Sequence, residues 1–251
     1  MRVRMAGLLC LLLMSREAGA TEEYRTAAQP DSAPKYQTLS DGRIGGICVE
    51  LFRLMEQEQP ALRILGDQAF LPLRRLEKKV LHGQLDFICG VGDSPARRNN
   101  FVYITPSIFT VRYHLAVRRD DAIEIRDWED VRALGREGVI LINHGSGAIA
   151  RLQAIGGLLI DSGGISSAAN YDKLLMKRGR FFYYRSPGFE ADIHQHQLDS
   201  QIRLLPKVME QTPFYILFHR QTSPERLKLF GDTLQRLASR GELAALVGRY
   251  D

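Results

Sequence analysis

The sequence predicts an α/β protein built from two lobes, and three observations lead to this fold class. Apolar runs of strand length alternate with amphipathic helical runs along most of the chain, which is typical of α/β layers. A charged segment, 118–121, interrupts the alternation before it resumes. Two late apolar runs, 204–208 and 214–218, are expected strands that lead the chain back to its first half. We therefore expect two α/β lobes joined by two hinge crossings.

The first lobe is expected to contain residues 21–112 and 214–251. An amphipathic helix should begin at Ile47, and a second should cover 70–82 and end at Gly83. Strands are expected over 85–91 and 111–117. Pro224, at a position suited to the first turn, should open the last long helix.

The second lobe is expected to contain residues 113–213. Asp127 should cap a short helix that runs to Leu134. The remaining expected elements are a strand at 139–142, a helix at 148–155, an apolar run at 158–160, a helix at 171–178, a strand at 181–184 and a weak helix at 193–198.

Residues 1–20 have the features of a secretory signal peptide. Arg2 and Arg4 precede an apolar run over 5–14, and Ala18-Gly19-Ala20 forms a cleavage site. The apolar run is too short to span a bilayer. Cleavage would lower the formal net charge from +5 to +3 by removing three arginines and one glutamate. We expect an exported, periplasmic protein.

A nucleic acid partner is not expected. The basic residues between Arg74 and Lys79 lie at helical spacing and are interpreted as a solvated helix face. Nucleic acid binding would require exposed aromatic residues among them, and export argues against it.

Two cysteines remain after cleavage, Cys48 and Cys89. An oxidising compartment permits a disulfide between them. Each also lies in an apolar run, where a buried free thiol packs well. The sequence leaves both alternatives open.

The strand at 85–91 ends in a polar turn that is a candidate ligand site. Gly92 and Ser94 lie in this turn, and Arg97 follows three residues later. Strand ends in α/β proteins commonly hold ligand contacts. A guanidinium there offers a planar set of donors to a carboxylate. Asp93 is equally suited to capping the turn.

A second candidate anion site is Gly145-Ser146-Gly147, which follows a strand and opens a helix. Free backbone N–H groups and a serine hydroxyl at such a position bind anions, although a plain helix cap has the same composition. No Gly-Lys-Ser/Thr follows, which excludes a Walker loop.

Several short motifs resemble those of the amino-acid-type solute-binding proteins of bacterial ABC importers. Gly83–Asp86 is similar to the family's G-x-x-D, Ser94–Arg97 to T-x-x-R and Tyr103–Ser107 to F-S-x-P-Y. The run Gly42–Leu51 is similar to G-x-x-x-G-F-x-x-D-L. The resemblance covers nearly all of the chain after residue 20.

The resemblance implies a two-lobed periplasmic binding protein fold and a binding function without catalysis. Arg97, with Ser94 and Gly92, would hold a ligand carboxylate, while Ser146 and Gly147 would approach it from the second lobe. Tyr36 is the nearest candidate for the aromatic residue that stacks on the ligand. The implied partners are a small-molecule solute and a membrane permease, with no cofactor and no metal; we expect a monomer.

The chain departs from the family where amino acid ligands are bound. Relatives carry G-R-x-D-A and a second acidic residue five positions later, which pairs with the ligand's ammonium. Here Phe182 and Pro187 take these positions, and Glu190 is a loose substitute. A buried ammonium without a carboxylate is poorly compensated. An anionic ligand without an amino group, facing Tyr183 and Tyr184, fits better.

Two alternatives share this scaffold. One is a sensor or orphan ligand-binding domain. The other is a dehydratase-type enzyme, for which His144 or Glu190 would transfer the proton. His194 and His196 are not expected to bind a metal, because two histidines at this spacing on a helix do not converge.

Overall fold

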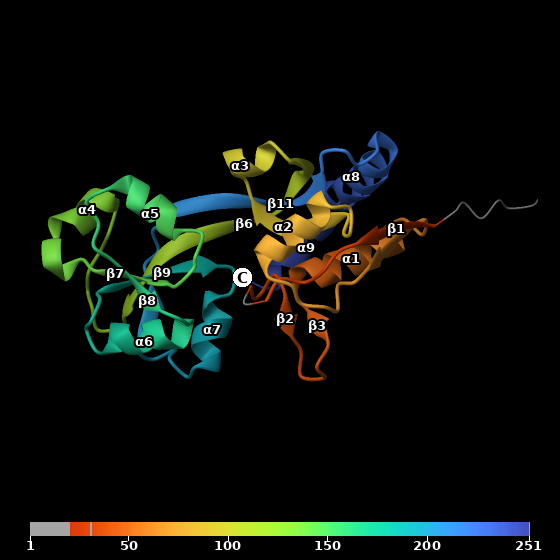
Figure 1. Ribbon diagram of the computed structural model, residues 1–251. Helices are drawn as coiled ribbons and strands as arrows, with labels where there is room; N and C mark the ends of the chain where they lie inside the picture. Colours follow the sequence, from red (N-terminus) through yellow and green to blue (C-terminus); the bar gives the residue numbers. More distant parts are fainter. Residues whose placement is uncertain (1–20, 31, 251) are drawn as a thin grey trace, which may run out of the picture.

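The computed structural model describes residues 21–30 and 32–250, and it confirms the α/β fold with two lobes (Figure 1). The proposed signal peptide lies outside the described residues. Within the described part of the chain, no helix is long and apolar enough to cross a membrane.

One lobe, on the right in Figure 1, combines the N-terminal elements with the C-terminal helices. Its buried centre is a cluster of aromatic rings from Tyr24, Phe52, Phe87, Phe218 and Phe230. Its elements are β1 (Glu22–Arg25), β2 (Gln37–Thr38), β3 (Ile44–Gly45), α1 (Ile47–Glu58), β4 (Leu62–Leu65), α2 (Leu73–Leu81), β5 (Phe87–Gly92), α3 (Pro95–Arg98), α8 (Pro224–Ser239) and α9 (Glu242–Gly248).

The other lobe has cores on both faces of its sheet, one around Phe181 and Tyr183 and one around Phe182 and Tyr184. The alternation of these four residues follows from the two-residue period of a strand. Its elements are α4 (Trp128–Ala133), β7 (Ile140–Asn143), α5 (Ile149–Ile155), β8 (Ile160–Gly164), α6 (Ser167–Leu175), β9 (Phe181–Ser186), α7 (Phe189–Gln195) and β10 (Ile202–Leu204), with a short 3-10 turn at Gly135–Glu137.

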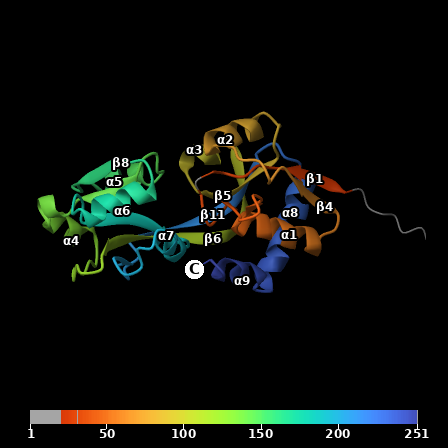
Figure 2. The same cartoon turned by 90° about the horizontal axis from the view of Figure 1, so that it is seen from below.

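Two long antiparallel strands connect the lobes, β6 (Phe101–Arg118) and β11 (Glu210–His219). They run between the two halves of the molecule in both views (Figures 1 and 2). The first part of β6 pairs only with β11, while Arg112–Ala116 pairs with β9. This exchange of partners makes one continuous sheet, ordered β5-β11-β6-β9-β7-β8. The lobe boundaries at 112/113 and 213/214 stay predictions.

Local sequence signals located most elements correctly. Asp127 caps α4 by accepting hydrogen bonds from the backbone N–H groups of Glu129 and Asp130 at 2.9 and 3.1 Å. Pro224 opens α8, as expected.

Two expected strands differ from the structure. The strand expected at 111–117 is only the second half of β6. The strand expected at 204–208 is wrong, because β10 ends at Leu204. Pro206 lacks the N–H group that a continued ladder would need.

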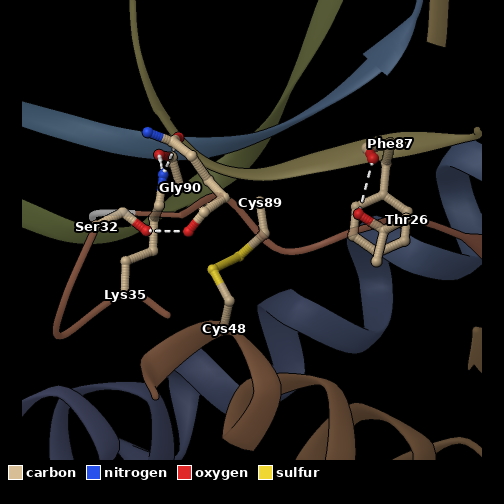
Figure 3. Close-up of a disulfide and its surroundings, with 8 residues drawn as sticks. Thr26, Ser32, Lys35, Cys48, Phe87, Cys89 and Gly90 are labelled. Carbon is tan, nitrogen blue, oxygen red and sulfur yellow. Dashed lines mark hydrogen bonds between the residues drawn. A yellow bond between two sulfur atoms is a disulfide. The ribbon is translucent and has the colours of Figure 1, made fainter. Parts of the chain in front are cut away.

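The structure resolves the alternative that the cysteines left open, because Cys48 and Cys89 form a disulfide (Figure 3). It joins α1 to β5, two elements whose cysteines are 41 residues apart in sequence. A cross-link across a loop of this size restricts the unfolded chain.

We predict that reduction of this disulfide lowers the free energy of unfolding by about 2–4 kcal/mol, the range for loops of this size. Urea unfolding with and without dithiothreitol measures the change. The double variant Cys48→Ala/Cys89→Ala serves as control and should be insensitive to the reductant. Equal urea midpoints for the oxidised and reduced wild type would contradict the prediction.

Candidate functional site

The turn after β5 holds Arg97 in a fixed position. Its Nε donates to Glu77 Oε1 at 2.7 Å, and its Nη1 donates to the carbonyl oxygen of Gly92 at 3.3 Å. Its backbone N–H donates to Ser94 Oγ at 3.4 Å, because Ser94 caps α3. The structure therefore brings together Gly92, Ser94 and Arg97, the three residues predicted at this strand end.

Some N–H donors of the Arg97 guanidinium have no partner in the described part of the chain. Among the described residues, Nη2 has no hydrogen-bond partner, while the side chain is 26% exposed. A guanidinium carries five N–H donors. The hydrogen bonds to Glu77 and Gly92 fix the orientation of the guanidinium and leave Nη2 for a ligand.

Arg98 differs from its neighbour in its contacts. Its Nε donates to Asp93 Oδ1 at 2.8 Å, and the pair is exposed. The hydrogen bond from Arg98 holds the pKa of Asp93 below its usual value. Asp93 therefore has a structural partner, but this partner is Arg98, and the side chain that caps α3 is that of Ser94.

The second candidate site, Ser146 and Gly147, lies in the turn between β7 and α5. Ser146 Oγ accepts from the N–H of Ala148 at 3.3 Å, so the hydroxyl closes the turn locally. The carbonyl oxygen of Gly147 accepts from Arg151 Nη1 at 3.3 Å. Arg151 lies over the ring of Tyr113 in β6 and pairs with Glu210 in β11. The turn is thereby tied to both connecting strands.

Two other predicted residues lie away from these turns. Tyr36 is only 2% exposed and packs in the core of the first lobe, so its ring offers no face to a ligand. Glu190 is exposed in the first turn of α7. His144 is also exposed and contacts the carbonyl oxygen of Ser162.

The expectation that Tyr183 and Tyr184 face a ligand is wrong. Both are buried, on opposite faces of β9. Their hydroxyls donate to Glu210 Oε2 at 2.8 Å and to Asp192 Oδ2 at 2.7 Å. Each ring is committed to a core of the second lobe.

Sequence reasoning missed Lys35, the residue before Tyr36. It is 5% exposed, and its Nζ donates to Gln29 Oε1 at 2.6 Å and to the carbonyl oxygen of Gly90 at 2.9 Å. The Lys35 stem crosses Gly90, which has a φ of +72° and where a Cβ would lie 2.2 Å from Lys35 Cδ. A single lysine in a loop gives no sequence pattern, so only the fold could identify it.

Burial lowers the pKa of Lys35 to about 7, and the positive charges of Arg185 and Arg97 act in the same direction. Arg97 belongs to the first lobe and Arg185 to β9 of the second. Lys35 therefore lies within the electrostatic influence of cations from both lobes.

Arg185 also makes a direct contact between the lobes. Its Nη2 donates to the carbonyl oxygen of Ala33 at 2.7 Å. Nearby, a Cβ on Gly188 would lie 2.7 Å from Pro34 Cδ, so the two loops touch. The segment 33–36 is therefore where the second lobe approaches the first.

We predict that the stability of the ligand-free protein rises with pH above about 7 because of Lys35. The unfolded lysine has a pKa near 10.4, so the unfolded chain binds more protons than the folded one between the two pKa values. The free energy of unfolding should then rise by up to about 1.4 kcal/mol per pH unit.

Urea unfolding of wild type and Lys35→Met between pH 6 and 9 measures this contribution. The variant should lack the rise, whereas Lys78→Met, at an exposed position on α2, should retain it. Identical pH slopes for wild type and Lys35→Met would contradict the prediction.

Comparisons with known proteins support the fold. No protein-family model matches the chain, and no curated protein matches it. Among solved structures, it is similar to ytmK of Bacillus subtilis, named as an amino-acid ABC transporter extracellular-binding protein. The TM-score is 0.76 and the identity 14%, over 92% of this chain and 97% of that chain.

Two further solved structures show the same similarity. Substrate binding domain 2 of GlnP from Lactococcus lactis, in an open conformation, has a TM-score of 0.67 and 18% identity over 91% of this chain and 94% of its own. The periplasmic VFT2 domain of BvgS from Bordetella pertussis has a TM-score of 0.69 and 15% identity over 91% and 93%. The chain therefore has the two-lobed periplasmic binding protein fold of these domains.

Proposed function

We propose that this protein captures a small anionic solute, a carboxylate, between its two lobes and delivers it to the membrane permease of an ABC-type importer. The observation that carries the proposal is the fixed guanidinium of Arg97 at the end of β5. Glu77 and the carbonyl oxygen of Gly92 orient it and leave Nη2 for a ligand. A carboxylate accepts two parallel hydrogen bonds from such a group.

From the Ser146-Gly147 turn, the second lobe would contribute the backbone N–H group of Gly147, because that of Ser146 already donates to the carbonyl oxygen of Asn143 at 3.1 Å. This turn follows a parallel strand of the second lobe, the usual position of ligand contacts in α/β sheets. Arg151 ties the turn to β6 and β11, so movement of the lobes about these strands would move the turn. Closure of the lobes around a ligand is a hinge motion.

An α-amino group on the ligand is disfavoured by the charges in this region. Phe182 and Pro187, at the positions where relatives carry acidic residues, are buried. Instead, two cations, Arg185 and Arg97, lie close enough to Lys35 to lower its pKa. An ammonium would be repelled there. Glu190, three residues after Pro187, is the acidic residue closest in sequence to the two positions where relatives carry acidic residues.

Delivery to a permease and a periplasmic location are supported by the names of similar structures. One of them is named as an amino-acid ABC transporter extracellular-binding protein, one as a substrate binding domain, and one is called periplasmic. The signal-peptide features of residues 1–20 agree with export.

We predict that Arg97→Ala weakens carboxylate binding by about 30-fold or more, because removing one partner of a desolvated charged pair costs about 2–5 kcal/mol. Isothermal titration, after a thermal-shift screen of carboxylates and amino acids on the wild type, gives the affinities. Arg98→Ala is the matched control, because Arg98 is also paired with a carboxylate, that of Asp93, but lies exposed.

The double variant Arg97→Ala/Glu77→Gln removes the carboxylate that Arg97→Ala leaves unpaired. It should restore stability without restoring binding. Full affinity in either Arg97 variant would overturn the proposed function.

We predict that ligands without an α-amino group bind at least as tightly as their amino acid counterparts, because no acidic residue takes the family's ammonium positions. Paired titrations of glutarate with glutamate, and of 3-phenylpropionate with phenylalanine, compare the two classes. Binding confined to the amino acid of each pair would contradict this expectation, and loss of that binding in Glu190→Gln would identify Glu190 as the ammonium partner.

A further inference from the structure

Lys35 is a buried cation whose polar neighbours are neutral. Its ammonium donates to an amide oxygen of Gln29 and to the carbonyl oxygen of Gly90, which uses two of its three N–H donors. Among residues 21–30 and 32–250, no carboxylate lies within salt-bridge distance of Nζ. A charge buried without a counter-ion is costly, so such groups commonly indicate a binding site.

The structure holds Lys35 firmly in this position. The backbone carbonyl of Lys35 accepts from the N–H of Cys48 at 3.1 Å, and that of Pro34 accepts from Ile47 at 3.0 Å. Both donors belong to the first turn of α1. The disulfide of Cys48 then ties this turn to β5, the strand that carries Gly90 (Figure 3).

Lys35 and Arg97 are attached to the same strand end. Lys35 binds the carbonyl of Gly90, and Arg97 binds the carbonyl of Gly92. Two residues of extended chain span at most about 7 Å. Two cations that are bound so close together on one strand match a ligand that carries two anionic groups a short distance apart.

The second lobe adds a third cation to the same region. Arg185 donates to the carbonyl of Ala33, two residues before Lys35. The positive charge of Arg185 lowers the pKa of Lys35, as that of Arg97 also does. The second lobe therefore already places a positive charge beside Lys35 in this structure.

We propose that the solute is a dianion, a short-chain dicarboxylate, whose second carboxylate is the missing counter-ion of Lys35. Arg97 holds the first carboxylate, as in the proposed function on which this inference rests. The third N–H of Lys35 donates to the second carboxylate. Arg185, anchored at Ala33, adds favourable charge. The dianion thereby compensates a buried charge that no carboxylate within residues 21–30 and 32–250 compensates.

The test compares dicarboxylates with monocarboxylates that differ only in a terminal methyl group. The pairs are succinate with butyrate, glutarate with pentanoate and adipate with hexanoate. Isothermal titration gives the affinity ratio within each pair for wild type, Lys35→Met and the control Lys78→Met. Lys35→Met keeps an apolar stem of similar length and removes the charge, and circular dichroism checks its folding.

We expect the wild type to prefer at least one dicarboxylate over its partner by about 30-fold or more, as for a buried charge pair. Lys35→Met should reduce this ratio to within about threefold of unity, mainly by weakening the binding of the dicarboxylate. Lys78→Met should keep the wild-type ratio. Asp31, outside the described residues, is examined with Asp31→Asn: an unchanged or larger ratio supports the proposal, and a lost ratio overturns it.

The pH dependence gives a second readout. The charged groups that act on Lys35 are Arg185 on β9 and Arg97 on α3. Because the empty site holds Lys35 partly neutral above pH 7, dicarboxylate binding there takes up a proton. The wild-type ratio should fall by up to about tenfold per pH unit above pH 7, and the Lys35→Met ratio should not change.

The outcomes separate this inference from the proposed function. Equal binding within every pair, or a dicarboxylate preference that survives in Lys35→Met, overturns the dianion proposal. If monocarboxylates still bind and depend on Arg97, the proposed function stands. If no carboxylate of either kind binds to the wild type, both proposals fail.

Discussion

The attachment of α1 to the end of β5 is the constraint on which the candidate site depends. The first N–H groups of α1 bind the carbonyls of Pro34 and Lys35, and the disulfide joins the same helix turn to β5. The backbone hydrogen bonds and the disulfide together fix the loop at 33–36 and β5 relative to one another. Lys35 and Arg97 then have defined positions along that strand end.

Two adjacent arginines show how tertiary contacts distinguish a surface ion pair from the residue to which we assign a binding role. Arg98 pairs with Asp93 at the surface, where an ion pair contributes little. Arg97 binds Glu77 from α2 and the Gly92 carbonyl, and it is more buried. A charge in a less solvated position interacts more strongly with a ligand, because the screening by water is weaker.

Two arginines of the second lobe, Arg151 and Arg185, link this lobe to the candidate site. Arg151 packs on Tyr113 and pairs with Glu210, which also accepts from Tyr183. The turn at Gly147 is thus coupled to the strands about which the lobes would move. Arg185 reaches across to Ala33. Because Arg151 contacts both connecting strands and Arg185 contacts the loop at 33–36, a movement of the lobes would change the positions of groups in the candidate site.

The fold by itself does not select the ligand. Structures with this fold include a protein named as an amino-acid ABC transporter extracellular-binding protein, a substrate binding domain of GlnP and a periplasmic domain of BvgS, all below 20% identity to this chain. Function on a shared fold depends on the particular residues of the site. Here these are cations at the ends of β5 and β9 and in the loop at 33–36, the set on which our proposal of an anionic ligand rests.

The sequence by itself determined the local features: the α/β alternation, the cap at Asp127, the start of α8 at Pro224 and the position of Arg97 at a strand end. These follow from side-chain periodicity and from short-range hydrogen bonds. Only the tertiary structure decided that the two cysteines pair, that β6 extends through both lobes, that Tyr36 is in the core and that Lys35 reaches β5. Each of these depends on contacts between residues far apart in the chain, which local periodicity does not encode.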